Sequence, residues 1–268
     1  MTEARMQETT EYAPGTFCWV ELGTTDGEAA KKFYTELLGW SFTDVPMGPA
    51  GVYTMLNQDG KDVGALYTMP EEMTAHGVPP HWLSYASVKN ADESAAKAKE
   101  LGGTLMKEPF DVFDVGRMAV VQDPTGAMFA IWQAGTHKGA GLVNLPVSLC
   151  WNELTTRDTA KAGDFYTGLF GWQKDAQQMD GMTYTMFVNN GRPAGGMYEP
   201  PPEMGDVPPN WLAYFAVNDA DATSARAADL GGKVCLPPTD IPNIGRFSVI
   251  QDPQGAAFAV IKLENPQV

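Results

Sequence analysis

The segment that decides the fold is FCWVELGTTDGEAAKKFYTELLGW, from Phe17 to Trp40, because the chain repeats it as LCWNELTTRDTAKAGDFYTGLFGW, from Leu149 to Trp172. Other matched segments follow in the same order: VYTM and TYTM, PPHWLSYASV and PPNWLAYFAV, QDPTGAMFAI and QDPQGAAFAV. Internal repetition is a stronger guide to architecture than local propensity. The sequence therefore predicts two domains of one fold, at residues 14–135 and 148–264, joined by a linker at 136–147.

Hydrophobic periodicity predicts the same order of elements twice within each half. In the first half, strands are expected at residues 17–22, 52–56 and 63–69, and the Thr25/Glu28 spacing favours a capping box at the start of a helix that ends at Gly39. A second unit follows, with a strand at 82–88, a helix at 91–101 stopped by Gly102-Gly103, and strands near 105, 118–122 and 127–133. Asp59-Gly60 and Asp123-Pro124-Thr125-Gly126 indicate turns. Each half is expected to contain two βαβββ modules.

Composition excludes several classes of partner. The 268 residues carry 33 acidic and 18 basic side chains, a formal charge of -15 that disfavours nucleic acid and anionic lipid surfaces. The first fifteen residues are polar, and no apolar run approaches the length of a membrane span, so a cytoplasmic location is expected. Three cysteines cannot all pair, and Cys18 and Cys150 are interpreted as small buried hydrophobic residues.

The motifs FYTELLGW, AKELGG and DPTGAMFAIWQ, repeated as FYTGLFGW, AADLGG and DPQGAAFAVIK, resemble the vicinal-oxygen-chelate superfamily of glyoxalases, bleomycin-resistance proteins and dioxygenases. The closest likeness is to tandem two-domain members described as glyoxalase-like or hydroxylase-like. The resemblance implies an α+β fold in which paired βαβββ modules form an open, incomplete β-barrel around a cavity, with helices outside. It leaves function open, because one fold hosts isomerases, dioxygenases and drug-sequestering proteins.

Metal-using members of that family bind a divalent ion through His, Glu or Gln on several strands. The resemblance places these ligand positions at Trp19, near Ala65, near Leu83 or Trp82, and at Ala130. In the second half they fall at Trp151, near Gly196, near Leu212 or Trp211, and at Ala259. None of these side chains coordinates a metal, and the three histidines, His76, His81 and His137, are interpreted as solvated or structural. We therefore expect no metal and no other cofactor.

Other recurring residues are candidates for a site. Glu21 and Glu153 lie two residues after Trp19 and Trp151, so strand geometry points each pair to one face. A carboxylate in an apolar pocket can act as a general base, whereas a structural glutamate would pair with an arginine such as Arg117 or Arg246. The candidate ligand-binding residues are Trp19, Trp151, Tyr53, Tyr184, Trp82, Trp211, Tyr85, Tyr214, Arg117 and Arg246. Core packing is the alternative for the aromatic residues.

Three functions stay open at this stage. The first is a metal-free protein that binds a small hydrophobic or aromatic molecule. The second is an enzyme, either a glyoxalase-like lyase or isomerase or a hydroxylase or dioxygenase, and the third is a signalling or antigen role. A monomer is favoured because two fused domains can build internally the pairing that single-domain relatives reach by dimerising, and a homodimer is the alternative.

Overall fold

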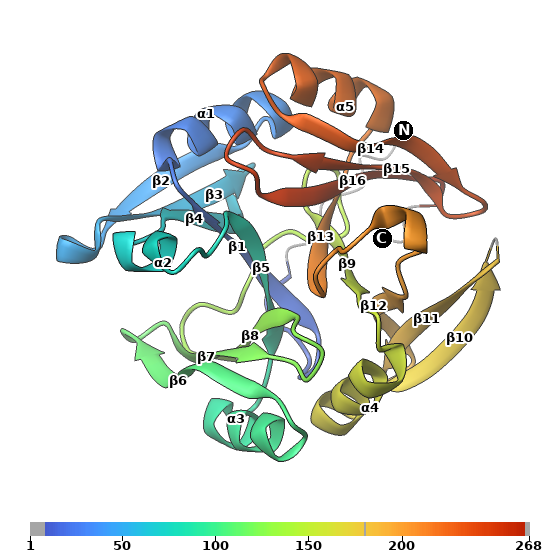
Figure 1. Ribbon diagram of the computed structural model, residues 1–268. Helices are drawn as coiled ribbons and strands as arrows, with labels where there is room; N and C mark the ends of the chain where they lie inside the picture. The colour runs from blue at the N-terminus through green and yellow to red at the C-terminus, as the bar shows by residue number, and fades with distance from the viewer. Residues whose placement is uncertain (1–8, 180, 266–268) are drawn as a thin grey trace.

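The computed structural model describes residues 9–179 and 181–265, and it contains two eight-stranded sheets, one from each half of the chain (Figure 1). The elements of the first half are β1 (Phe17–Thr24), α1 (Gly27–Leu38), β2 (Ser41–Pro46), η1 (Gly48–Ala50), β3 (Val52–Gln58), β4 (Lys61–Thr68), α2 (Glu71–Ala75), β5 (His81–Ser87), α3 (Ala91–Glu100), β6 (Thr104–Val112), β7 (Gly116–Gln122) and β8 (Met128–Ala134). Those of the second half are β9 (Leu149–Thr155), α4 (Thr159–Phe170), β10 (Gln173–Met179), β11 (Met182–Asn189), β12 (Arg192–Tyr198), η2 (Pro202–Met204), β13 (Asn210–Ala216), α5 (Ala220–Asp229), β14 (Lys233–Ile241), β15 (Gly245–Gln251) and β16 (Ala257–Leu263).

Each sheet joins two βαβββ modules, which confirms the predicted fold class. The first sheet has the order β2-β3-β4-β1-β5-β8-β7-β6, and the second has the equivalent order β10-β11-β12-β9-β13-β16-β15-β14. The two modules of each half meet where β1 pairs antiparallel with β5, and β9 with β13. This junction places the first strand of each module side by side at the centre of the curved sheet.

Local sequence signals explain most element ends. Asp59 and Gly60 both adopt positive φ, as a two-residue hairpin requires, and Gly102 has φ 90° just after α3. The Asp123 carboxylate accepts the backbone N–H groups of Thr125, Gly126 and Ala127, which fixes the turn between β7 and β8.

The predicted capping box at the first helix was wrong. Asp26 is the N-cap of α1, and its Oδ1 accepts the backbone N–H of Ala29 at 3.0 Å. Glu28 instead forms an ion pair with Lys31 one turn later. The reason is that the strand runs on to Thr24, so the helix starts one residue later than the box needs.

Each helix pair in contact joins the two halves of the chain. Figure 1 shows α1 beside α5 and α3 beside α4, and each pair is in contact. One apolar core therefore combines α1, β3 and β4 with β13, α5 and β16, and a second combines α3, β7 and β8 with β9, α4 and β11. Each core is built from both halves, so burial of apolar surface ties the halves together.

A buried hydrogen-bonded clasp lies in each of these cores. Tyr166 Oη donates to Asp123 Oδ2 of the other half at 2.9 Å and accepts from Trp211 Nε1 at 2.7 Å. In the same way Tyr34 Oη donates to Asp252 Oδ2 at 3.0 Å and accepts from Trp82 Nε1 at 3.0 Å. Both clasps thus join a helix of one half to the β-turn aspartate of the other.

The linker and the segment before β1 pack against the protein surface. Ala140 donates its backbone N–H to Cys18 O at 2.8 Å, and Tyr12 Oη donates to Ala140 O at 2.6 Å. Trp172 Nε1 of the second half donates to Gly15 O at 2.8 Å. Residues 1–8 of the polar N-terminal stretch lie outside the described residues. Among the residues that are described, no helix has the length and apolarity to cross a membrane.

Candidate functional site

A four-residue cluster built from a tryptophan, a glutamate and two tyrosines occurs on the same face of each sheet. In the first half Tyr53 donates to Glu21 Oε2 at 2.6 Å and Tyr85 donates to Glu21 Oε1 at 3.0 Å. Trp19 Nε1 lies 3.4 Å from Tyr53 Oη, to which it donates. We refer to Trp19, Glu21, Tyr53 and Tyr85 as the first tetrad.

The second tetrad has the same connections in the second half. Tyr184 donates to Glu153 Oε2 at 3.0 Å, and Tyr214 donates to Glu153 Oε1 at 2.6 Å. Trp151 Nε1 donates to Tyr184 Oη at 3.0 Å. Three strands supply each tetrad: β1, β3 and β5 in the first half, and β9, β11 and β13 in the second. The tryptophan and the glutamate are two residues apart on β1 or β9, so they face the same side of the sheet.

Burial dominates the electrostatics of the two glutamates. Desolvation raises the pKa of Glu21 and of Glu153, and the hydrogen bonds donated by the tyrosine hydroxyls oppose this increase. Burial and the neighbouring Glu153 carboxylate raise the pKa of Tyr214, so the tyrosine hydroxyl stays protonated and remains a donor. Each carboxylate oxygen accepts one tyrosine bond and keeps a further lone pair for a ligand.

Eight of the proposed site residues therefore come together in the two tetrads, and four do not. Trp82 and Trp211 lie on the opposite face of their strands, in the clasps described above. The reason is alternation along the strand: Leu83 and Leu212, the next residues, take the tetrad face. Their placement as cavity walls is therefore corrected.

The suggested pairing of the arginines with the glutamates is also corrected. Arg117 binds Asp92 at 2.8 Å and Asp111 at 2.9 Å. Arg246 binds Asp221 and Asp240 in the equivalent way. The pairs with Asp92 and Asp221 are bidentate and hold the start of α3 to β7 and the start of α5 to β15. The glutamates are hydrogen-bonded by tyrosines instead.

His137 of the linker covers the first tetrad. Its ring packs edge-on against Trp19, with ring centroids 4.6 Å apart, and Trp132 Nε1 donates to His137 O at 3.1 Å. Tyr12, Ala140 and Val143 complete an apolar cover over the same cluster. Burial lowers the pKa of His137, which favours the neutral ring. Trp19 is only 4% exposed.

The second tetrad is more open. Trp151, Leu212 and Phe247 are all partly exposed, whereas Trp19, Leu83 and Met118, at the matching places in the first half, are buried. The sequence did not reveal this difference, because it arises from a linker residue that folds back over one site.

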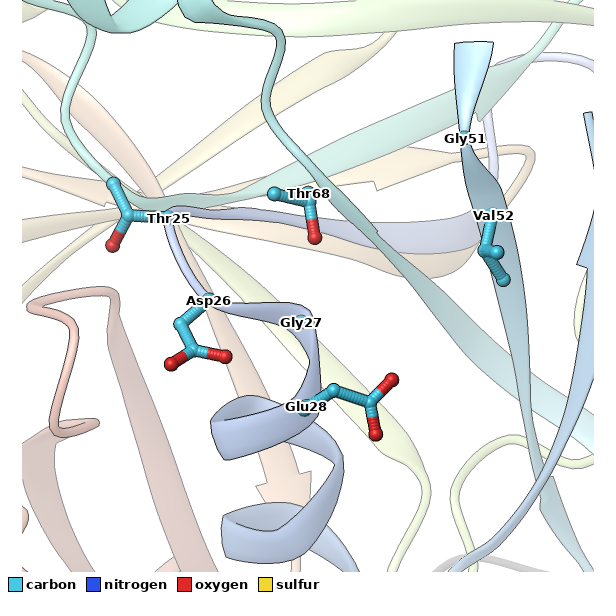
Figure 2. A pocket seen from close by; sticks show the side chains of 7 residues that line it. All are labelled: Thr25, Asp26, Gly27, Glu28, Gly51, Val52 and Thr68. Atoms are coloured by element: carbon cyan, nitrogen blue, oxygen red, sulfur yellow. The ribbon is translucent and has the colours of Figure 1, made fainter. Parts of the chain in front are cut away.

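Two surface pockets lie elsewhere. Figure 2 shows the larger, about 360 Å³, around the start of α1, lined by Thr25, Asp26, Gly27, Glu28, Gly51, Val52 and Thr68. Its carboxylates already cap the helix and pair with Lys31. A smaller pocket of about 210 Å³ lies at the start of α4, between the halves. Neither contains a tetrad residue.

The family follows from a comparison with known sequence families. The model of the Glyoxalase/Bleomycin resistance protein/Dioxygenase superfamily matches residues 16–131 and again residues 148–260. The chain belongs to this superfamily. Within it, the chain is 45% identical over 259 residues to a Mycobacterium tuberculosis protein named "Putative glyoxylase CFP32", covering 96% of this chain and 98% of the relative.

Other similar proteins extend the comparison. The chain is 38% identical over 264 residues to the anthracycline biosynthesis protein DnrV of Streptomyces peucetius, covering 95% of each chain. Among solved structures, the Mn(II)-bound glyoxalase from Novosphingobium aromaticivorans superposes with a TM-score of 0.63 at 14% identity, covering 95% of this chain and 86% of that one. A homoprotocatechuate 2,3-dioxygenase variant from B. fuscum gives a TM-score of 0.64 at 16% identity, covering 97% and 74%. These structural likenesses show the shared fold.

The residues at the family's metal positions do not fit a divalent ion. Trp19, Ala65, Leu83 and Ala130 lie together in one apolar cluster on the tetrad face. The second half places Trp151, Leu212 and Ala259 together in the same way. One glutamate remains on each of these faces, and a tetrahedral or octahedral site needs three or more ionic or imidazole donors. No group of three or more His, Cys, Asp or Glu side chains suited to a metal occurs among the described residues.

Proposed function

We propose that this protein binds a small aromatic molecule, without a metal, at the second tetrad. The observation that carries the proposal is the Glu153 carboxylate, held by two tyrosine hydroxyls beneath a partly exposed tryptophan. A carboxylate fixed in this way offers its free lone pairs to a ligand hydroxyl, while Trp151, Leu212 and Phe247 supply an apolar wall.

The ligand expected from these groups is a planar aromatic that carries a hydroxyl group. Planar rings pack well against tryptophan and phenylalanine, and a neutral hydroxyl is the donor that an anionic carboxylate binds most strongly. The name of the Streptomyces relative, an anthracycline biosynthesis protein, supports a polycyclic aromatic ligand. The covered first tetrad has a structural role in this proposal.

A second candidate is proton transfer by Glu153. The raised pKa of this carboxyl brings its proton exchange closer to neutral pH, as a general base in an isomerase or lyase requires. The name of the mycobacterial relative, a glyoxylase, supports this class of reaction. Both candidate functions require that an aromatic molecule bind at the second tetrad, so the same binding experiment is the first test of each.

The experiment measures binding of 2-naphthol, a fluorescent planar aromatic with one neutral hydroxyl, by isothermal titration calorimetry. We expect one site per chain in the wild type. Glu153→Gln should weaken binding about tenfold or more, because it replaces a charged acceptor. Glu21→Gln is the matched control, and binding should be unchanged because His137 and Trp19 close that site.

Three results would overturn the proposal. Metal analysis of the purified protein could find a stoichiometric divalent ion in each half, the wild type could fail to bind 2-naphthol, or Glu21→Gln could weaken binding as much as Glu153→Gln. For the proton-transfer candidate, hydrogen–deuterium exchange at the α-carbon of a bound ketone should disappear in Glu153→Gln.

The compartment and the assembly state belong to the same proposal. Cys18, Cys150 and Cys235 are all unpaired, as in a reducing cytoplasm, and both repeat cysteines donate to tyrosine carbonyl oxygens at 3.4 Å. The cores shared between the halves supply within one chain the contacts that a dimer would otherwise supply, which supports a monomer. Gel filtration combined with light scattering checks the assembly state.

A further inference from the structure

A third tyrosine lies beside each tetrad, on the strand that pairs with the glutamate's own strand. In the second half Gly196 pairs with Glu153, and Tyr198, two residues further along β12, pairs with Thr155. Residues two apart on a strand share a face, so Tyr198 faces the same side as Glu153. Burial raises the pKa of Tyr198, and the Glu153 charge adds to the increase. The hydroxyl is therefore protonated and available as a donor.

The hydroxyl proton of Tyr198 has a weak acceptor. Its described acceptor is Met204 Sδ, at 4.0 Å, and a thioether is a poor hydrogen-bond acceptor. The Thr155 side chain opposes the effect of burial and lowers the pKa of Tyr198 in part. Among the described residues the Tyr198 hydroxyl proton therefore has only a weak acceptor, which a carbonyl oxygen of a ligand could replace.

Met204 is the last residue of η2, in an exposed segment that is held at both ends. Arg157 donates through Nη1 to Pro200 O at 2.7 Å and through Nη2 to Gly205 O. Between these two anchors, Met204 is 47% exposed. A flexible, exposed methionine side chain in this position can move aside without disturbing the anchored backbone.

We propose that Tyr198 is a specificity-determining residue of the second site and donates to an acceptor oxygen of the ligand. This inference rests on the proposed function. Glu153 accepts the ligand hydroxyl, and Tyr198 donates to a carbonyl on the same molecule, which takes the place of the Met204 sulfur. The ligand class narrows from hydroxylated aromatics to aromatics that carry a hydroxyl and a carbonyl close together.

The first half supplies a matched control. Tyr67 Oη there lies 3.9 Å from the Sδ of Met73, which belongs to α2, so the tyrosine–methionine contact recurs. The adjacent tetrad is covered by His137, so Tyr67 has no ligand to receive. A variant at Tyr67 therefore makes the same chemical change without touching the proposed site.

The test compares two naphthyl probes that differ only in the carbonyl: 2-hydroxy-1-(2-naphthyl)ethanone and 2-(2-naphthyl)ethanol. The wild type should bind the ketone more tightly than the alcohol. Tyr198→Phe should weaken binding of the ketone about three- to tenfold, the range of one neutral hydrogen bond, and leave binding of the alcohol within about twofold. Tyr67→Phe should change neither affinity, and Met204→Leu, which keeps the bulk and removes the sulfur, should leave the ketone bound at least as tightly.

The outcomes distinguish a failure of the Tyr198 proposal from a failure of the proposed function. If the wild type binds neither probe nor 2-naphthol, both proposals fail. If 2-naphthol binds at the second tetrad but Tyr198→Phe weakens the ketone and the alcohol equally, or weakens neither, the proposed function stands and the role of Tyr198 is refuted. Thermal unfolding of Tyr198→Phe, expected to match the wild type, excludes an indirect loss through misfolding.

Discussion

Replacing Tyr166 with phenylalanine should destabilise the whole molecule, although it removes a single oxygen atom. Tyr166 is fully buried, and its hydroxyl both donates to Asp123 in the other half and accepts from Trp211. Phenylalanine fits the same space and leaves an indole N–H and a carboxylate oxygen without this partner. An unsatisfied buried polar group costs about 1–3 kcal/mol, so the two together give roughly 2–6 kcal/mol.

The loss of stability expected for Tyr166→Phe can be compared with that for a tyrosine that makes one hydrogen bond. Tyr12 donates one hydrogen bond, to Ala140 O, from a partly exposed position. Tyr12→Phe should therefore cost about 1 kcal/mol. At about 2–4 °C of melting temperature per kcal/mol for a chain of this size, Tyr166→Phe should lower Tm by roughly 4–24 °C, and Tyr12→Phe by only about 2–4 °C.

The assay is urea unfolding followed by tryptophan fluorescence and, in parallel, by far-ultraviolet circular dichroism. The two probes should give coincident transitions, because both cores are shared between the halves. Tyr34→Phe removes the other clasp and should match Tyr166→Phe. The double variant should be additive within about 0.5 kcal/mol, since the clasps lie in separate cores. A Tyr166→Phe variant no less stable than Tyr12→Phe, or a wild type that unfolds in two steps, would refute the reasoning.

Three further predictions concern the tetrads. His137→Ala should expose Trp19, so acrylamide should quench the tryptophan fluorescence more strongly than in the wild type. The number of 2-naphthol molecules bound per chain should rise from one to two. Unchanged quenching would contradict the proposed cover. Because the folded-state pKa of Glu153 is raised, the native state binds the proton more tightly than the unfolded chain, and wild-type stability relative to Glu153→Gln should increase as pH falls from 7 through the raised pKa toward about 4.3. Denaturation at pH 7 and pH 5 measures this, and a difference that shrinks at low pH would show the opposite sign. Gly196→Ala should displace Tyr184, since a Cβ there would overlap its hydroxyl, at a cost of about 1–3 kcal/mol, visible as a change in Trp151 emission.

The sequence was sufficient for the order of elements because the deciding signals are local. Asp59-Gly60, Gly102-Gly103 and the Asp123 turn each act within a few residues. The strands at 41–46 and 173–179 were implied by the βαβββ order but not located. Both are edge strands, and nearly every residue in them is exposed, so they lack the alternation of buried and exposed residues that marks a strand.

The site was less predictable because it depends on which side chains of a buried strand face the tetrad side of the sheet. All residues of β5 after His81 are buried, so periodicity could not tell whether Trp82 or Leu83 faces the tetrad. The tryptophan–glutamate pairs were found because a period of two is enough to place them on one face. The cover by His137 and the aspartate partners of Arg117 depend on contacts between distant segments, which no local pattern reports.

The clasps and the tetrads are mechanically connected because they share strands. On β13, Trp211 belongs to a clasp and Tyr214 to the second tetrad, and Tyr166, which orients Trp211, is held by Asp123 of the first half. The position of β13 is thus set partly by residues of the other half. Close packing transmits small shifts of a strand to both of its faces. A change at Asp123 should therefore alter the Tyr214–Glu153 hydrogen bond, although Asp123 belongs to neither tetrad, and this dependence gives the fused halves a functional reason to stay in one chain.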